Sequence, residues 1–114
     1  MSLDTTFLRV CAAADVPVGA AAAYEVGDTP IALVHAEDGE FYATYDECSH
    51  AAVPLSDGEV DGCTLECWLH GSRFDLRTGE PSGLPATEPV ATFPVEIRDG
   101  DIYVSTTPSN GVMP

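Results

Sequence analysis

Lysine is absent from this 114-residue chain, and its four arginines face nineteen aspartates and glutamates, for a formal net charge of −15. Such a protein repels nucleic-acid phosphates, so we expect no nucleic-acid partner. Anionic membrane surfaces repel it in the same way. The charge favours fast, weak association with a basic protein surface. A surface that only keeps the protein soluble, or one adapted to a salty cytoplasm, would carry the same charge, so these interpretations stay open.

Long apolar runs are absent as well, since no segment approaches the roughly 18 apolar residues that indicate a membrane-spanning helix. The first residues, Met1 to Asp4, lack the basic and then apolar pattern of a secretory leader. We therefore expect a cytoplasmic protein without a membrane partner. In a reducing cytoplasm the four cysteines are more typical of metal binding than of disulfides, because two of them lie close to histidines.

Motifs for independent catalysis are also missing. The chain has no glycine-rich phosphate loop and no strand–helix dinucleotide fingerprint, so we expect it to bind neither NAD nor flavin by these routes. Two of its three histidines belong to a metal-binding pattern, so only one histidine is left to act as the base that a serine or cysteine nucleophile needs. We therefore predict that the protein is not catalytic alone.

What the sequence does contain is a series of short strand-like segments. Apolar and polar residues alternate at 93–97 and again at 102–104, around the Asp-Gly pair at 99–100, a pattern that predicts a β-hairpin. A second hairpin is predicted from the apolar run 31–34 and the aromatic segment 41–45. No amphipathic helix is indicated. The fold class is therefore predicted as all-β, an antiparallel sandwich or barrel.

The composition changes along the chain. Apolar residues make up 45% of it, enough for the core of one domain, which we place at residues 1–105. The middle, about 46–89, is rich in Gly, Pro, Ser and Asp and holds most of the cysteines and histidines. A long irregular region in a compact domain is usually functional or disordered, and these side chains favour function. Residues 106–114, with two prolines, are predicted to form a flexible tail.

Two short clusters in this middle region hold the candidate ligands. Cys48 and His50 form one, and Cys67 and His70 form the other, with sixteen residues between His50 and Cys67. Zinc accepts two thiolates and two imidazoles tetrahedrally. In a Rieske-type [2Fe–2S] cluster both thiolates bind one iron and both imidazoles bind the other. The mixed spacing suits two loop tips that each reach both irons, whereas zinc arms more often pair Cys with Cys or His with His.

The pattern resembles the Rieske signature, C-x-H followed by C-x-x-H-G, which Gly71 completes. The resemblance covers about residues 8–105 and is closest to stand-alone Rieske ferredoxins of bacterial aromatic-ring dioxygenases. Rieske ferredoxin-like proteins encoded beside iron–sulfur assembly genes are similar as well. Further matching residues are Leu55, Gly58, Phe74, Asp75, Thr78, Gly79 and Pro85. The resemblance implies a Rieske-like antiparallel fold with a small inserted cluster-binding subdomain and one [2Fe–2S] cluster per subunit.

The resemblance also implies a set of site residues. The set comprises Cys48, His50, Cys67 and His70 as metal ligands, with Ser72, Trp68 and Pro85 around the cluster. Ser72 matches the family serine whose hydroxyl donates toward a bridging sulfide. Pro85 lies in a segment that resembles the loop covering the cluster. Trp68 either shields the cluster from water or forms an exposed contact at the docking tip.

Three positions depart from the high-potential members of the family. Those members carry a disulfide between the cluster loops, and the matching positions here are Val53 and Leu69. Phe74 stands where they place a tyrosine that donates a hydrogen bond to a cysteine sulfur. Such hydrogen bonds stabilise the reduced cluster, so losing one lowers the reduction potential. We expect a potential near the lower end of the Rieske range, roughly −150 mV.

The resemblance implies that the protein functions as a soluble, monomeric electron carrier. The ferredoxin would take electrons singly from an NAD(P)H-dependent flavin reductase and pass them to a terminal non-haem-iron, ring-hydroxylating dioxygenase. Both partners are expected to present basic docking surfaces. The alternatives are a redox partner of iron–sulfur cluster assembly and a relative of the nitrite-reductase small subunit, although the four ligands weigh against the latter. The remaining cysteines, Cys11 and Cys63, are predicted to be core residues.

Overall fold

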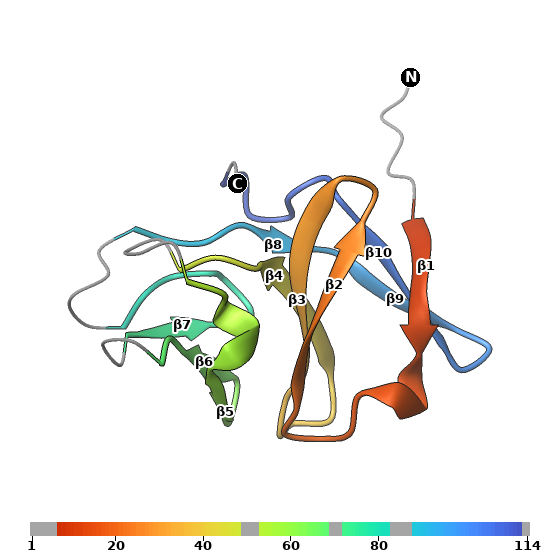
Figure 1. The fold of residues 1–114 in the computed structure, drawn as a ribbon, viewed down its shortest axis with the longest axis horizontal. Helices are drawn as coiled ribbons and strands as arrows, with labels where there is room; N and C mark the ends of the chain where they lie inside the picture. The colour runs from red at the N-terminus through yellow and green to blue at the C-terminus, as the bar shows by residue number, and fades with distance from the viewer. Residues whose placement is uncertain (1–6, 49–52, 69–71, 83–87, 113–114) are drawn as a thin grey trace.

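The computed structural model describes residues 7–48, 53–68, 72–82 and 88–112. Within these ranges the chain forms three antiparallel sheets, and its only helical turns are two short 3₁₀ segments, Ala13–Asp15 (η1) and Leu55–Asp57 (η2) (Figure 1). None of the helical turns in this part of the chain is long and apolar enough to cross a membrane. The prediction of an all-β antiparallel fold is confirmed.

The central sheet divides the molecule. It contains β2 (Ala21–Val26), β3 (Thr29–His35), β4 (Phe41–Tyr45) and β8 (Thr92–Phe93), in the order β2-β3-β4-β8. Strand β3 contains the apolar run Ile31–Val34, which is completely buried. Neighbouring side chains of a strand point to opposite faces, so a strand without alternation must be covered on both faces. The structure meets this requirement with a separate core on each side.

The base core lies on one face of β3, where Ile31 and Leu33 pack. Its buried members are Cys11, Val16, Val26, Ile31, Leu33, Ala43, Ala91, Phe93, Ile102 and Val104. The subdomain core lies on the other face, where Ala32 and Val34 pack. Its buried members are Ala32, Val34, Ala36, Cys48, Leu55, Leu65, Cys67, Phe74, Leu76 and Val90. The cysteines of the two predicted ligand clusters are therefore in the same core.

A second sheet closes the base core. It contains β1 (Phe7–Ala12), β9 (Val95–Arg98) and β10 (Asp101–Ser105), in the order β1-β10-β9. The predicted hairpin forms between β9 and β10, and both turn residues, Asp99 and Gly100, have positive φ angles of 51° and 83°. This backbone geometry suits the twist of a two-residue hairpin and favours an Asp-Gly pair.

The third sheet is the predicted inserted subdomain. It contains β5 (Glu59–Asp61), β6 (Thr64–Glu66) and β7 (Arg73–Asp75), in the order β5-β6-β7, and lies on the left of Figure 1 beside the central sheet. After β7 the chain turns back on itself, since the Asp75 N–H donates to the Glu80 carbonyl and the Ser82 N–H donates to the Arg73 carbonyl. Leu65 and Phe74 point into the subdomain core from adjacent strands.

The end of the chain returns to the central sheet. The Ser109 N–H donates to the Thr92 carbonyl over 2.7 Å, and Val112 packs against the base core. The predicted flexibility of residues 106–114 stays a prediction. The contacts show that the described part of this segment, up to residue 112, lies against β8 (Figure 1).

Candidate metal centre

Two arms of the chain begin at Cys48 and Cys67, and each arm is closed by the same backbone hydrogen bond. The Cys48 N–H donates to the Val53 carbonyl over 3.0 Å, and the Cys67 N–H donates to the Ser72 carbonyl over 2.7 Å. In both arms the acceptor follows the donor by five residues. This repeated closure gives the two cysteines equivalent places at the start of the two arms, and each arm also carries one of the predicted imidazole ligands in its sequence.

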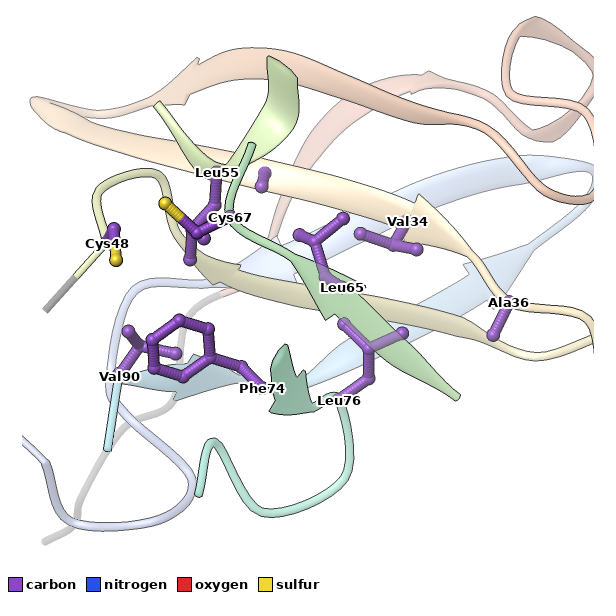
Figure 2. Close-up of a cluster of buried hydrophobic side chains, with 10 residues drawn as sticks. Val34, Ala36, Cys48, Leu55, Leu65, Cys67, Phe74, Leu76 and Val90 are labelled. Atoms are coloured by element: carbon purple, nitrogen blue, oxygen red, sulfur yellow. The ribbon is translucent and has the colours of Figure 1, made fainter. Parts of the chain in front are cut away.

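The two thiols lie in the same apolar environment. Cys48 is 3% exposed and Cys67 is 1% exposed, and both belong to the subdomain core. Figure 2 shows their side chains together at the end of this core away from Ala36, with Phe74 and Val90 beside them. None of the four cysteines, all of which are described, forms a disulfide. A thiolate in such surroundings is costly unless a cation neutralises it, so this pair fits a metal centre.

The other two predicted ligands, His50 and His70, lie outside the described residues, as do Leu69 and Pro85. Within the described ranges, no group of three or more His, Cys, Asp and Glu side chains converges on one point. The structure therefore brings the two predicted thiolate ligands into one core, and the assignment of the imidazole ligands stays a prediction.

Two residues predicted to tune the centre lie at its edge. Ser72 is 2% exposed, and its carbonyl closes the second arm. Phe74, two residues further along β7, is completely buried and lies beside the cysteines (Figure 2). A phenyl ring has no hydroxyl to donate to sulfur, so it contributes packing alone. Val53 closes the first arm with its backbone and packs against the subdomain core.

Comparison with known proteins decides the kind of centre. Residues 6–94 match the family described as "Rieske [2Fe-2S] domain". The chain belongs to the Rieske family. A Rieske domain holds a [2Fe–2S] cluster, so the expected cofactor is confirmed and the zinc alternative falls. The two buried thiols are the donor type that such a cluster requires on one of its irons.

Curated relatives match almost the whole length of this Rieske chain. "Ferredoxin CarAc" of Metapseudomonas resinovorans is 39% identical over 104 residues, which cover 90% of this chain and 96% of that protein. The "3-phenylpropionate/cinnamic acid dioxygenase ferredoxin subunit" of Photorhabdus laumondii is 46% identical over 102 residues, which cover 88% of this chain and 94% of the relative. These relatives are ferredoxin components rather than enzymes.

Solved structures agree in fold. A chain in "Complex of reduced oxygenase and oxidized ferredoxin in carbazole 1,9a-dioxygenase" has a TM-score of 0.83 and 38% identity, covering 93% of this chain and 98% of that one. The ferredoxin of Sphingomonas yanoikuyae B1 has a TM-score of 0.81 and 34% identity, covering 89% and 99%. The predicted Rieske-like fold is thus confirmed.

The surface near the Rieske arms carries an aromatic side chain. Trp68 follows the buried Cys67 directly, yet it is 53% exposed. Of the two interpretations given above, its exposure agrees with an accessible contact at the tip. The function of Trp68 stays a prediction.

A polar network at the other side of the subdomain was not predicted. Cys63 is partly exposed, and its thiol donates to the Asp38 carboxylate over 3.1 Å. The Arg77 guanidinium lies 3.1 Å from the Cys63 sulfur, and the Tyr42 hydroxyl donates to Asp38 over 2.9 Å. Cys63 therefore belongs to a surface network that joins the subdomain to the β3–β4 hairpin, and the prediction of a simple core residue is incomplete.

Charge and hydrogen bonding shift the pKa values in this network. The Glu40 N–H and then the Cys63 thiol donate to Asp38 and hold the pKa of its carboxyl below the usual range. The hydrogen bond to Asp38 raises the pKa of Cys63 above that of an ordinary thiol. The thiol form is thereby favoured. Cys11, in contrast, is a buried core residue as predicted, and its hydrogen bond together with burial raises the pKa of Tyr24 to about 12.

Every arginine of the chain is paired with an acid, and all four are described. Arg9 pairs with Asp101, Arg73 with Asp61 and Glu66, Arg77 with Asp38, and Arg98 with Glu96. Such exposed pairs add little stability. Because the chain has no lysine, these pairs leave its surface with a large excess of carboxylates and no uncommitted arginine.

Proposed function

We propose that the chain is an electron-transfer ferredoxin that delivers single electrons to a terminal ring-hydroxylating dioxygenase. The observation that supports this most directly is the share of each relative's length that the chain matches. Its relatives, named as a ferredoxin and as a dioxygenase ferredoxin subunit, are matched over 94–96% of their own length, so almost every part of these relatives has a counterpart in this chain. The solved complex of a ferredoxin with its oxygenase concerns a protein of the same fold and 38% identity.

Four ligands carry the proposed chemistry. Cys48 and Cys67 would hold one iron, and His50 and His70 would hold the other, as the family pattern requires. When bound, the [2Fe–2S] cluster supplies a redox centre that gains and loses one electron. The protein contributes the subdomain core, which surrounds both sulfurs and excludes water from them. Ser72 is the proposed hydroxyl donor toward the cluster, and Pro85 belongs to the proposed covering segment.

A low reduction potential is part of the proposal. The phenyl ring of Phe74 lies beside the cysteines and offers no hydrogen bond to sulfur. The net charge of −15 of the whole chain disfavours the additional negative charge of the reduced cluster. Both effects lower the potential toward the lower end of the Rieske range, roughly −150 mV.

The proposed partners follow from the motifs that the chain lacks and from the charge of its surface. An NAD(P)H-dependent flavin reductase would supply electrons, since the chain has no nucleotide-binding motif of its own. All four arginines are paired with acids, so both partners would have to supply the cations at the interface. Trp68, half exposed beside Cys67, is the proposed contact at the exit for electrons. A carrier of this kind docks briefly over a small area, and we propose a cytoplasmic monomer.

Two experiments test the function in sequence. Freshly purified protein, reduced with dithionite, should give a rhombic electron paramagnetic resonance (EPR) signal of low average g, and an absent signal would refute a Rieske cluster. Reduced protein should then be oxidised within milliseconds to seconds by the oxygenase component of a carbazole or 3-phenylpropionate dioxygenase in a stopped-flow mixing experiment. An intact signal without any electron transfer to either oxygenase would leave the cluster correct and the proposed role wrong.

A further inference from the structure

The side chain of Asn110 makes four hydrogen bonds to four separate places in the chain. Its Nδ2 donates to the carbonyls of Thr78 and Val90, each over 2.9 Å. Its Oδ1 accepts from the N–H groups of Thr92 over 3.2 Å and Val112 over 3.1 Å. A carboxamide offers two donor hydrogens and two lone pairs on oxygen, so this side chain uses its full hydrogen-bonding capacity.

The two halves of the carboxamide bind different parts of the molecule. The accepting oxygen binds residues on the side of the base core, because Thr92 belongs to β8 and Val112 packs against that core. The donating nitrogen binds residues on the side of the subdomain core. Thr78 lies in the turn after β7, and Val90 belongs to the subdomain core. Asn110 therefore ties the cluster-binding subdomain to the central sheet.

The backbone is packed closely around this junction. The Val90 N–H donates to the Gly79 carbonyl over 2.9 Å. A Cβ atom on Gly79, whose φ is +80°, would lie 2.2 Å from the Val90 carbonyl oxygen and 2.7 Å from Asn110 Nδ2. Both the close approach and the positive φ require glycine here. The turn after β7, the segment at Val90 and the Asn110 side chain thus fit together with little freedom to shift.

The same junction supports the predicted cluster environment. Val90 is buried beside Phe74 in the core that contains Cys48 and Cys67 (Figure 2). In the sequence, Val90 comes five residues after residues 83–85, the segment that resembles the covering loop, and Ser82 directly precedes that segment. The Ser82 N–H donates to the Arg73 carbonyl over 2.8 Å, so the chain is anchored on both sides of that segment.

We propose that Asn110 is a positioning residue for the iron–sulfur cluster. It acts through Val90, which lies in the same core as the two cysteines and which the donating half of the carboxamide ties to the turn at Thr78. This inference rests on the proposed assignment of Cys48 and Cys67 as ligands. Losing the two donated bonds would let the Val90 segment move away from the sulfurs and admit water, which changes the surroundings of the cluster.

The substitution Asn110→Asp tests the donating half. Aspartate has nearly the same shape and keeps an oxygen for the N–H groups of Thr92 and Val112. Its second oxygen faces the Thr78 and Val90 carbonyls, and an ionised carboxylate has no hydrogen to donate to them. Asn110→Ala removes all four bonds. Ser109→Ala is the matched control, because the Ser109 hydroxyl bonds only to Thr92 in the described structure, on the base side.

The readouts are the EPR line shape, the reduction potential by protein-film voltammetry, and the rate at which visible absorbance is lost in the presence of an iron chelator. We expect Asn110→Asp to lose the cluster about tenfold faster than the wild type, since the part-buried bond to the Val90 carbonyl and the exposed bond to the Thr78 carbonyl both lose their donor. Its EPR spectrum and potential should change, while Ser109→Ala should match the wild type in all three. If Asn110→Ala does not fold, Asn110→Asp carries the test.

Two results would overturn the inference. One is an Asn110→Asp protein whose spectrum, potential and rate of cluster loss equal those of the wild type. The other is an equal change in Ser109→Ala, which would assign the effect to the whole C-terminal segment. A wild-type protein without any Rieske signal would instead refute the proposed function, so the two failures are distinguishable.

Discussion

The Cys63 thiol and the Asp38 carboxylate, which are 25 residues apart in the sequence, lie 3.1 Å apart in the structure. This bond joins the turn between β5 and β6 to the turn between β3 and β4. A second connection lies next to it, because the Gly62 N–H donates to a Glu37 side-chain oxygen over 2.9 Å. The inserted subdomain is therefore attached to the central sheet by polar contacts here and by Asn110 at its other junction.

The first prediction concerns acid stability. The pKa of Asp38 is lowered in the folded protein, mainly by the Glu40 N–H and the Cys63 thiol. Its contribution to stability is thus present above the pKa of an unfolded aspartate, about 3.9, and is lost as the pH falls through the lower folded value. Asp38→Asn should have a lower melting temperature at neutral pH and a smaller loss of stability on acidification below about pH 4.

Thermal unfolding between neutral and acidic pH, followed by circular dichroism, checks this prediction. Asp28→Asn, in the exposed turn between β2 and β3, removes the same charge at another turn and serves as the control. Equal pH profiles for Asp38→Asn and Asp28→Asn would show that the Asp38 network contributes nothing specific.

The second prediction separates the four cysteines. Cys48→Ser and Cys67→Ser should fail to hold a cluster, because both thiols lie in the subdomain core at the start of the two arms. Cys11→Ser and Cys63→Ser should each keep about two irons per chain and the Rieske spectrum, since Cys11 lies in the base core and Cys63 in the Asp38 network. Iron analysis and visible absorbance decide, and a Cys63→Ser protein without iron would contradict the assignment.

The sequence predicted the strands well and the junctions poorly, for physical reasons. A continuous apolar run such as Ile31–Val34 requires burial on both faces, and the fold supplies it. Cys63 and Leu65 are two residues apart, a spacing that would place both on one face of a strand and so predicts a core position for Cys63. However, Gly62 has a φ of +61° and β6 begins only at Thr64, so strand alternation does not extend back to Cys63. A sequence pattern shows which residues alternate along one strand. It cannot show that the turn containing Cys63 lies against Asp38 in another hairpin.

The tail shows the same limit for long-range contacts. Serine, asparagine, glycine and proline in 106–114 are typical of a flexible end. Nothing in their order shows that the Asn110 side chain reaches the Val90 carbonyl, twenty residues away. The ligand motif, in contrast, was readable because its chemistry depends on residue types at short spacing. The matching backbone hydrogen bonds that close the two arms, from Cys48 to Val53 and from Cys67 to Ser72, could not be predicted from the sequence and are seen only in the structure.

The third prediction concerns the reduction potential. Phe74→Tyr would place a hydroxyl beside the cysteines, where it donates toward sulfur and stabilises the reduced cluster. The potential should rise by up to about 60 mV, the equivalent of about 1.4 kcal/mol for one electron. Phe93→Tyr makes the same chemical change in the base core and should leave the potential unchanged. Protein-film voltammetry measures both, and an unshifted Phe74→Tyr with an intact cluster would mean that the hydroxyl does not reach a sulfur.

The fourth prediction tests the docking tip. Trp68 is half exposed directly after Cys67, and exposed tryptophans at the centre of an interface often dominate its binding energy. Trp68→Ala should slow electron transfer to the oxygenase about tenfold at low protein concentration, with no change in the reduction potential. Ile97→Ala, which trims a side chain of similar exposure (47%) on β9, should keep the wild-type rate because β9 belongs to the base.

Ionic strength separates the aromatic contact from the charge in the same stopped-flow experiment. The excess of carboxylates should accelerate the encounter with a basic partner, so the wild-type rate should fall about tenfold or more between low salt and about 0.5 M salt. Trp68→Ala should show the same salt dependence at a lower absolute rate, because it removes apolar contact and no charge. If the salt dependence disappears together with the Trp68 side chain, the variant has changed the way the two proteins dock. If the wild-type rate does not depend on salt, the acidic surface serves solubility or salt adaptation rather than docking.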